Sequence, residues 1–348
     1  MQGRRVLILY RELAGYVMTS LRHLAEHCDT AVDIVAYPVN SEAPFAFDDS
    51  PGVRILRRSD YPADRILALV EEHGYDVIVC GGWIDADYLK VVQRSKHIPC
   101  ALAFDKQWLG SLKDLAVAVR NRLFFKTQFD YAFVPGEEQV RFAQKMGFKP
   151  HQIVTGVYAC DLPLFTEVYK RRKFGTEVRK IWYAGRYIPQ KGLDTLWEAI
   201  LPLLEMPGNE WELHCIGTGS DFDRRVLHPK IIHHGFVQPA DLRELITDGE
   251  IFVLPSLFEP WGVVVHEFAT AGYAMVLTDK VGARTAFLED GRNGYVVPAG
   301  DPSALRDGLL KLISLDRPRL QTMGEHSHQL AQTITPGTYA RAVVSMMK

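Results

Sequence analysis

Residues 251–278 read IFVLPSLFEPWGVVVHEFATAGYAMVLT, and this stretch decides the fold of the chain. Two short apolar runs, 251–254 and 274–278, enclose a loop and a segment with the apolar spacing of a helix. A strand, a helix and a second strand in this order form a βαβ unit, in which the two strands lie parallel. The stretch therefore predicts part of a parallel β-sheet that is covered by helices.

The same alternation of strand and helix patterns continues along all 348 residues. Further strands are predicted at 5–10, 31–37, 53–57, 76–80, 100–104, 131–134, 152–157, 180–184, 211–216, 231–235 and 294–297. The rhythm stops over 160–178, where a basic cluster replaces the apolar periodicity, and it starts again near residue 180. The sequence therefore predicts an α/β protein with two doubly wound, Rossmann-like domains, 1–160 and 179–330, joined by a linker over 161–178.

Composition excludes several classes of protein. The 40 basic and 42 acidic residues give a formal net charge of −2, which removes the electrostatic argument for nucleic-acid binding by the whole surface. No apolar stretch approaches the roughly 18 residues that a membrane-spanning helix needs, so peripheral contact is the only kind of membrane contact left. The five cysteines are widely spaced and form no CxxC pair, which is typical of reduced thiols. We therefore expect a cytoplasmic protein.

Two cations follow the first predicted strand of the second domain. In IWYAGRYIPQKG, residues 181–192, the strand leads into a loop that carries Arg186 and Lys191. Open α/β sheets bind ligands at the carboxyl ends of their strands, and two cations there suit a diphosphate. The next strand ends in a turn with Gly217 and Gly219, a pattern that allows the backbone to approach a nucleotide closely.

Two acids lie in the stretch quoted at the outset. Glu259 stands at the mouth of the loop, and Glu267 lies about one and a half turns inside the following helix, whose first amides would be unsatisfied and point at an anion. A helix-capping role explains Glu259 poorly because Pro260 follows it, and a buried Glu267 without a partner is costly. One carboxylate can meet hydroxyls near a reacting carbon while the other accepts hydrogen bonds from a ribose.

The segment 254–272 resembles the Glu-x7-Glu motif of retaining nucleotide-sugar glycosyltransferases of the GT-B fold. These enzymes are glycosyltransferase family 4 and its glycogen-synthase-like relatives. The resemblance covers about residues 180–310 and includes 185–186, 191–192, 217–219, 279–282, 289–298 and 301–302. The first half resembles the family more weakly, through its strand order, Ile98-Pro99 before a strand, and 134–137 before a helix.

The resemblance implies two Rossmann-like domains that face each other across a cleft, with a C-terminal helix in 331–348 that crosses back to the first domain. It implies transfer of a sugar, with retention of anomeric configuration, from a UDP- or GDP-linked donor to a hydroxyl acceptor. The expected acceptor is a glycan, a lipid-linked glycan or a small molecule, as in polysaccharide or glycoconjugate synthesis. Neither a metal nor another cofactor is expected.

Site residues follow from the resemblance by matching position. Those implied in catalysis are Glu259, Arg186, Lys191 and Asp105. Those implied in donor binding are Gly15, Gly217, Gly219, Val237, Glu259, Pro260, Trp261, Gly262, Val263 and Glu267. Arg186 and Lys191 would hold the diphosphate, and Glu267 the ribose. Glu259 and the backbone of 260–263 would hold the transferred sugar, and main-chain groups near Val237 the nucleobase.

The first domain departs from the family at one position. Many relatives carry a histidine after the strand that follows Ile-Pro, whereas this chain has Asp105. An aspartate there can orient hydroxyls or accept the proton of the acceptor. Gly15 matches the glycine that approaches the diphosphate, in a loop with fewer glycines than is usual for the family.

Other classes stay open. Two Asp-x-Asp pairs, 85–87 and 221–223, would suit a metal-dependent GT-A enzyme, but each falls where a helix is expected to begin, and acids are favoured there by the helix dipole. The adjacent histidines 233 and 234 would point to opposite faces of a strand, so together with His228 they predict no zinc site. A phosphorylase of similar architecture and a silent nucleotide-sugar-binding protein are the two remaining alternatives.

The segment 108–126, WLGSLKDLAVAVRNRLFFK, mixes apolar and basic residues. One interpretation is an amphipathic helix that lies on an anionic membrane and brings the cleft to a lipid-linked acceptor. The other is a helix that packs on the first sheet and exposes a solvated basic face. The sequence does not choose between them, and it does not predict the oligomeric state.

Overall fold

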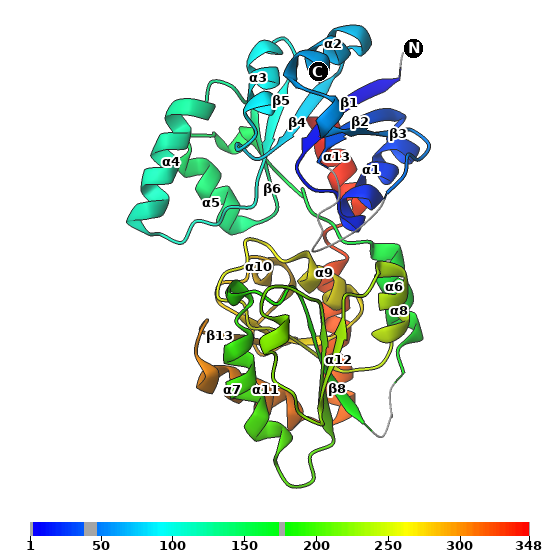
Figure 1. Cartoon of the computed structure of the whole chain (residues 1–348), viewed down its shortest axis with the longest axis vertical. Helices are drawn as coiled ribbons and strands as arrows, with labels where there is room; N and C mark the ends of the chain where they lie inside the picture. Colours follow the sequence, from blue (N-terminus) through cyan, green and yellow to red (C-terminus); the bar gives the residue numbers. More distant parts are fainter. Residues whose placement is uncertain (1–2, 38–46, 174–177, 348) are drawn as a thin grey trace. The chain divides into compact units, whose positions relative to one another are not determined.

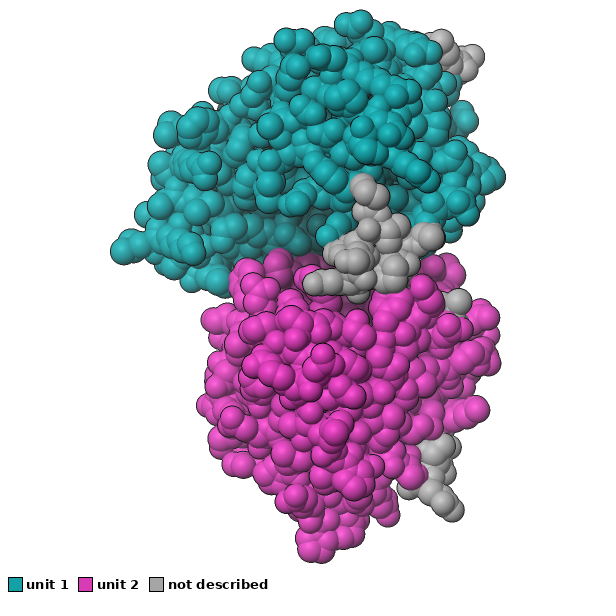
Figure 2. Space-filling view, viewed as in Figure 1, with its two compact units in different colours: residues 1–160, 334–348 teal, residues 161–333 magenta. Residues whose placement is uncertain are grey.

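A computed structural model of the chain describes residues 3–37, 47–173 and 178–347. The chain divides into two compact units, residues 1–160 with 334–348, and residues 161–333 (Figure 2). Among the described residues, no helix has the length and apolar character needed to cross a membrane.

The first unit is built on a seven-stranded parallel sheet of order β3-β2-β1-β4-β5-β6-β7. Its strands are β1 (Arg4–Tyr10), β2 (Thr30–Ala36), β3 (Val53–Arg57), β4 (Val77–Gly81), β5 (Cys100–Ala103), β6 (Tyr131–Val134) and β7 (Ile153–Thr155). Its helices are α1 (Gly15–Cys28), α2 (Ala63–His73), α3 (Ala86–Arg94), α4 (Leu112–Phe125), α5 (Glu137–Lys145) and α13 (Pro336–Ser345). Figure 1 shows α1 and α13 side by side.

Two hydrophobic cores cover the two faces of this sheet. Alternate side chains of β1 point to opposite faces, so Val6 and Ile8 join the core beneath α1 and α13. Leu7 and Leu9 join the core beneath the helices of the other face. All four side chains are fully buried, which explains why a central parallel strand has a continuous apolar sequence.

The second unit repeats this plan with a six-stranded parallel sheet of order β10-β9-β8-β11-β12-β13. Its strands are β8 (Arg179–Ala184), β9 (Trp211–Ile216), β10 (Ile231–Gly235), β11 (Ile251–Leu254), β12 (Ala274–Thr278) and β13 (Gly294–Val297). Its helices are α6 (Leu162–Arg171), α7 (Leu193–Leu204), α8 (Pro239–Leu245), α9 (Val263–Thr270), α10 (Arg284–Phe287), α11 (Pro302–Ile313) and α12 (Arg317–Ala331). The predicted fold class, two Rossmann-like α/β units with parallel sheets, is confirmed.

The segment 161–178, expected as a linker, instead contains α6, which packs on α9 and α8 within the second unit. The boundary between the units falls at Cys160 and Asp161. Leu162, Phe165 and Val168 form a single buried stripe that is too short to stand out beside the basic residues at the end of the helix. Residues 174–177 of the expected linker lie outside the described residues. In 331–348, α13 packs on α1 of the first unit.

One buried hydroxyl joins the ends of two strands in the first unit. Tyr88, on α3, places its hydroxyl 2.9 Å from the Val35 carbonyl oxygen of β2 and 3.1 Å from the Tyr10 carbonyl oxygen of β1. By contrast, the buried hydroxyl of Tyr339 has no hydrogen-bond partner among the described residues. The chain thus offers two buried tyrosines, one with a bonded hydroxyl and one without.

We expect Tyr88→Phe to lower the free energy of unfolding by about 1–2 kcal/mol, because the bond that joins β1 and β2 is lost. Tyr339→Phe is the matched control and should be neutral or slightly stabilising, because a buried hydroxyl without a partner is removed. Urea unfolding of both variants beside the parent measures the difference. Equal losses would contradict this account.

Candidate functional site

The predicted donor residues gather where the strand order of the second sheet reverses. The strands β8 and β11 are neighbours in the sheet but are far apart in the chain, and the loops after their carboxyl ends are 185–192 and 255–262. Open α/β sheets bind ligands at such a point because the flanking connections run to opposite faces and leave a crevice. Arg186 and Lys191 lie in the first loop and Glu259 in the second.

Lys191 and Glu259 form an ion pair between these two loops. Each side chain is only 13% exposed, so each charge would be costly to leave without the other. The backbone of Glu259 is fixed by two further hydrogen bonds: its N–H donates to the Lys280 carbonyl (3.1 Å), and its carbonyl accepts from Gly282 (3.0 Å). Arg186 is exposed, and its carbonyl accepts a hydrogen bond from the Tyr183 hydroxyl (3.0 Å).

A glycine allows the two loops to touch. Gly192 has φ of +67°, and a Cβ built on it would lie 2.2 Å from the Pro255 carbonyl oxygen. The Leu257 N–H donates to the Gln190 carbonyl (2.8 Å) beside this approach. Because only glycine fits such a contact without displacement of backbone, residue 192 sets the distance between the loop of Lys191 and the loop of Glu259.

The turn after β9 approaches the same loop. A Cβ on Gly217, where φ is +126°, would lie 2.0 Å from the Gly185 carbonyl oxygen. The Tyr187 N–H donates to the Thr218 carbonyl (2.9 Å), and the Asp221 N–H donates to the Tyr187 carbonyl (2.9 Å). The predicted residues Gly217 and Gly219 therefore pack against the loop that carries Arg186. Val237 lies just beyond the end of β10, the neighbour of β9.

Helix α9 begins beside Glu259. Its N-cap is Gly262, which has no side chain to cap the amino-terminal amides. This end of the helix therefore presents backbone N–H groups and the positive end of the dipole. The side chain of Trp261, one of the predicted donor residues, is buried, with its ring centroid 6.1 Å from that of Phe287.

Glu267 lies further along α9, at the face that meets α6. Burial and the nearby negative charge of Asp161 raise the pKa of Glu267 to about 7. Asp161 caps α6 and accepts a hydrogen bond from the Leu164 N–H (3.2 Å). Burial on an apolar helix disfavours the charged form of Glu267, as the sequence suggested. Its carboxyl group therefore holds its proton near neutral pH.

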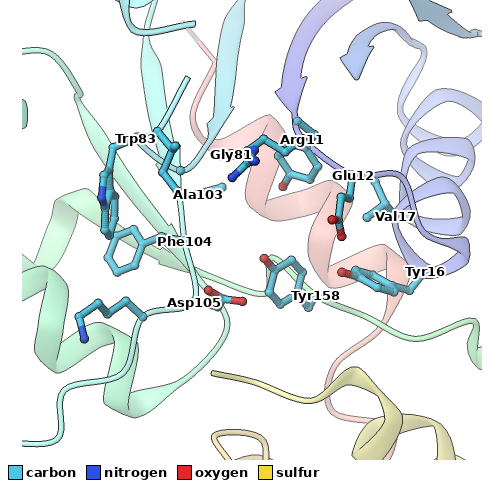
Figure 3. Close-up of a pocket in the computed structure, with 14 residues that line it drawn as sticks. Arg11, Glu12, Tyr16, Val17, Gly81, Trp83, Ala103, Phe104, Asp105 and Tyr158 are labelled. Carbon is cyan, nitrogen blue, oxygen red and sulfur yellow. The ribbon is translucent and has the colours of Figure 1, made fainter. Parts of the chain in front are cut away.

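The first unit holds a pocket at its own point of strand reversal, between β1 and β4. Its volume is about 440 Å³, and three segments at the ends of β1, β4 and β5, together with residues of α1 and the loop after β7, line it (Figure 3). The lining residues are Tyr10, Arg11, Glu12, Tyr16, Val17, Gly81, Gly82, Trp83, Ile84, Ala103, Phe104, Asp105, Lys106 and Tyr158.

Aromatic rings and charged side chains of both signs line this pocket. Trp83 packs against Phe104, with ring centroids 5.6 Å apart, and Tyr16 packs edge-on against Tyr158 at the same distance. The carboxylate of Asp105 points toward Tyr158 (Figure 3). Sugars and other polyols bind to such surfaces because rings cover their apolar faces while carboxylates accept from their hydroxyls.

Sequence reasoning had named only Asp105 and Gly15 in this unit. The structure places Asp105 in the pocket and Gly15 at the first residue of α1, directly before Tyr16. The aromatic lining residues were missed, although the rule that open α/β sheets bind ligands at strand ends could have found Trp83 and Phe104, which follow β4 and β5.

The alternative metal motifs have structural roles. Asp85 caps α3 by accepting from the Asp87 and Tyr88 N–H groups and pairs with Arg58, and Asp221 pairs with Arg224. His233 and His234 point to opposite sides of β10 as expected, one bonded to the Tyr187 hydroxyl and the other to His214. Within the described residues, no group of three or more histidine, cysteine, aspartate or glutamate side chains is arranged to hold a metal.

Comparison with known proteins agrees with this geometry. The family model described as Glycosyl transferases group 1 matches residues 178–315, which include both loops and α9. Residues 178–315 belong to this glycosyltransferase family. A D-inositol 3-phosphate glycosyltransferase of Geodermatophilus obscurus is 26% identical over 345 residues, which cover 83% of this chain and 74% of that protein. Other curated relatives are matched over 38–43% of their length.

Solved structures extend the likeness beyond residues 178–315 to nearly the whole chain. Sucrose-phosphate synthase from Thermosynechococcus elongatus has a TM-score of 0.76 at 17% identity, with 98% of each chain covered. HepE of Anabaena, solved in complex with UDP and glucose, has a TM-score of 0.71 at 17% identity, again with 98% of each chain covered. The two Rossmann-like units therefore have the GT-B fold.

The contact at Gly192 generates a stability prediction. Gly208 has a similar φ of +73°, but a Cβ there would meet nothing within 4 Å. We expect Gly208→Ala to cost about 1 kcal/mol through its backbone conformation alone. Gly192→Ala should cost about 1–3 kcal/mol more, because the Pro255 carbonyl or the loop must move. Denaturant unfolding measures both, and equal costs would show that the approach of the loops is not tight.

Glu267 generates a pH prediction. Its carboxyl group keeps its proton up to about pH 7 when folded and up to about pH 4.5 when unfolded, so the folded state binds more protons between these values. Stability should therefore fall as pH rises through this window. Glu267→Gln removes the titrating group. The melting temperature of the variant minus that of the parent should therefore increase as the pH rises from 5 to 8. The exposed Glu205→Gln controls for the lost charge. A constant difference across this range would count against the raised pKa.

Proposed function

We propose that this chain is a retaining glycosyltransferase that moves a sugar from a nucleoside diphosphate sugar, UDP- or GDP-linked, to a hydroxyl acceptor. The observation that carries the proposal is the Lys191–Glu259 pair beside the amino-terminal end of α9, whose N-cap is a glycine. It joins a cation for a diphosphate, a carboxylate for sugar hydroxyls and a set of backbone amides at one sheet edge. The family of residues 178–315 and the UDP and glucose in the HepE structure support the same reaction.

In the proposed reaction, the bond between the anomeric carbon and the diphosphate oxygen breaks, and negative charge gathers on the departing diphosphate. Lys191, Arg186 and the amides that open α9 would stabilise this charge, which lowers the barrier to an oxocarbenium-like state. Because these groups supply positive charge themselves, we propose that the reaction needs no metal. Glu259 would accept hydrogen bonds from the sugar, and Glu267 from the ribose.

The pocket of the first unit is the proposed acceptor site. Its rings suit the apolar face of a sugar or cyclitol, and Asp105 would orient the attacking hydroxyl and accept its proton. The acceptor forms a bond to the anomeric carbon on the face from which the diphosphate leaves, so the configuration is retained. The proposed acceptors are glycans, lipid-linked glycans and small polyols.

We expect UDP or GDP to raise the melting temperature of the parent, because a ligand of the folded state stabilises it. Lys191→Ala and Arg186→Ala should weaken this shift and lower turnover of the matching donor by about 10²–10³-fold, the usual loss for one group that stabilises transition-state charge. Lys311→Ala, on α11 and outside these loops, is the control and should keep full turnover. Turnover is measured as release of nucleoside diphosphate.

The outcomes of this assay separate the alternatives. Binding of a nucleotide sugar without release of diphosphate would indicate a silent binding protein, and consumption of inorganic phosphate would indicate a phosphorylase. Loss of turnover in excess chelator would contradict metal independence. Near-normal transfer by both variants would overturn the assignment of the diphosphate site.

A further inference from the structure

Helix α4 of the first unit exposes most of its large hydrophobic residues and buries polar residues. The residues that it buries are Asp114, Ala118 and Asn121. Most of its large apolar residues are exposed instead, with Leu112 at 86% and Leu123 at 75%, and only Val117 and Phe125 are half-buried against the core. The other exposed apolar residues are Leu115, Val119 and Phe124. A helix that packs on a core shows the opposite distribution, because burial of apolar surface is what holds it there.

Specific contacts hold the helix in this orientation. Asp114 forms a capping box with Ser111 and an ion pair with Lys106 (2.7 Å). At the other end, Phe125 stacks against Trp83, with ring centroids 6.2 Å apart. Rotation of α4 to bury its leucines would break the ion pair and expose Phe125. The exposed apolar face is therefore a stable feature of this unit.

The exposed apolar residues of α4 form one stripe along the helix. At 100° per residue, Leu112, Leu115, Val119 and Leu123 fall within an arc of about 80° on the helix surface. Lys113 and Arg120 border one side of this arc and Arg122 borders the other, while Lys126 follows the carboxyl end of the stripe; all four are exposed. The only acidic residue in 109–126 is Asp114, which is buried and paired. We call this surface, formed by these four apolar and four basic residues, the α4 face.

We infer that the α4 face docks the protein on the surface of an anionic lipid bilayer. A stripe of leucine and valine would enter the region between headgroups and acyl chains, while lysine and arginine on both borders would remain at the level of the lipid phosphates. Charge complementarity favours lipid over a protein partner, since the basic residues lie on both sides of the apolar stripe and a flat anionic surface meets both at once.

The same helix lies close to the pocket of the first unit. Trp83 lines that pocket and also stacks on Phe125, the last residue of α4. Figure 1 shows α4 beside α5 at one side of the unit. Docking through α4 would thus hold the pocket near the lipid surface, although the inference about the membrane does not depend on the proposed transfer reaction.

The test is flotation of the full chain with vesicles of phosphatidylcholine alone and of equal parts phosphatidylcholine and phosphatidylglycerol. The parent should bind the anionic vesicles at least tenfold better, and binding should fall as salt rises, because screening weakens the basic contacts. Leu112→Ser with Leu123→Ser should lower binding at least tenfold, and Lys113→Glu with Arg120→Glu should do the same. Melting temperatures show whether each variant is folded.

Two matched controls separate the α4 face from general properties of the surface. Leu227→Ser removes a leucine that is 77% exposed in the second unit, and Lys96→Glu with Arg319→Glu makes the same change of net charge at exposed positions elsewhere. Both should bind like the parent. Failure of the parent to bind anionic vesicles, or equal losses in the controls, would overturn the inference. A parent dimer that the leucine variant dissociates, seen by light scattering, would also overturn it and assign the face to self-association.

Discussion

The ion pair between Lys191 and Glu259 is the interaction on which the second unit's site depends. Each charge is mostly withdrawn from water, so neither loop can move away from the other without leaving a charge unpaired at a considerable cost. The close approach of Gly192 to Pro255 sets the distance between the loops, and the sheet order that makes β8 and β11 neighbours brings them together. The proposed chemistry uses the groups that this arrangement brings to the edge: a cation, a carboxylate and the amino-terminal end of a helix.

Both units use the same topological feature for different chemistry. In each sheet the strand order reverses between two central strands, and the loops after these strands carry the candidate site. The second unit fills this position with glycines, charged side chains and backbone amides, which suit an anion. The first unit fills it with aromatic rings and with charged side chains of both signs, which suit a polyol. In the proposed reaction, the different side chains at the strand ends would make one copy of this architecture the donor site and the other the acceptor site.

Helix α4 shows that hydrophobic periodicity predicts an amphipathic helix but not what its apolar face contacts. Its apolar residues recur at helical spacing, and that pattern predicts an amphipathic helix with equal force whether the apolar face meets a core or a bilayer. The direction of the face is decided by contacts outside the pattern: Asp114 to Lys106 and Phe125 to Trp83. The short helix α6 illustrates the converse. Its three buried apolar residues are enough to fix it on α9 and α8, but they are too few to mark a helix within a basic stretch.

The sequence by itself determined the two parallel sheets and most of their strands, because buried parallel strands are continuous apolar runs and crossover helices have their own period. It also determined which residues of the second unit gather at one edge, since Arg186, Lys191 and Glu259 each lie in a loop that follows the carboxyl end of a strand. Only the tertiary structure decided that Lys191 pairs with Glu259, that the pKa of Glu267 is raised and that aromatic residues from three strand ends form one pocket. These properties depend on distance and burial between segments far apart in the chain, and local sequence patterns carry no information about either.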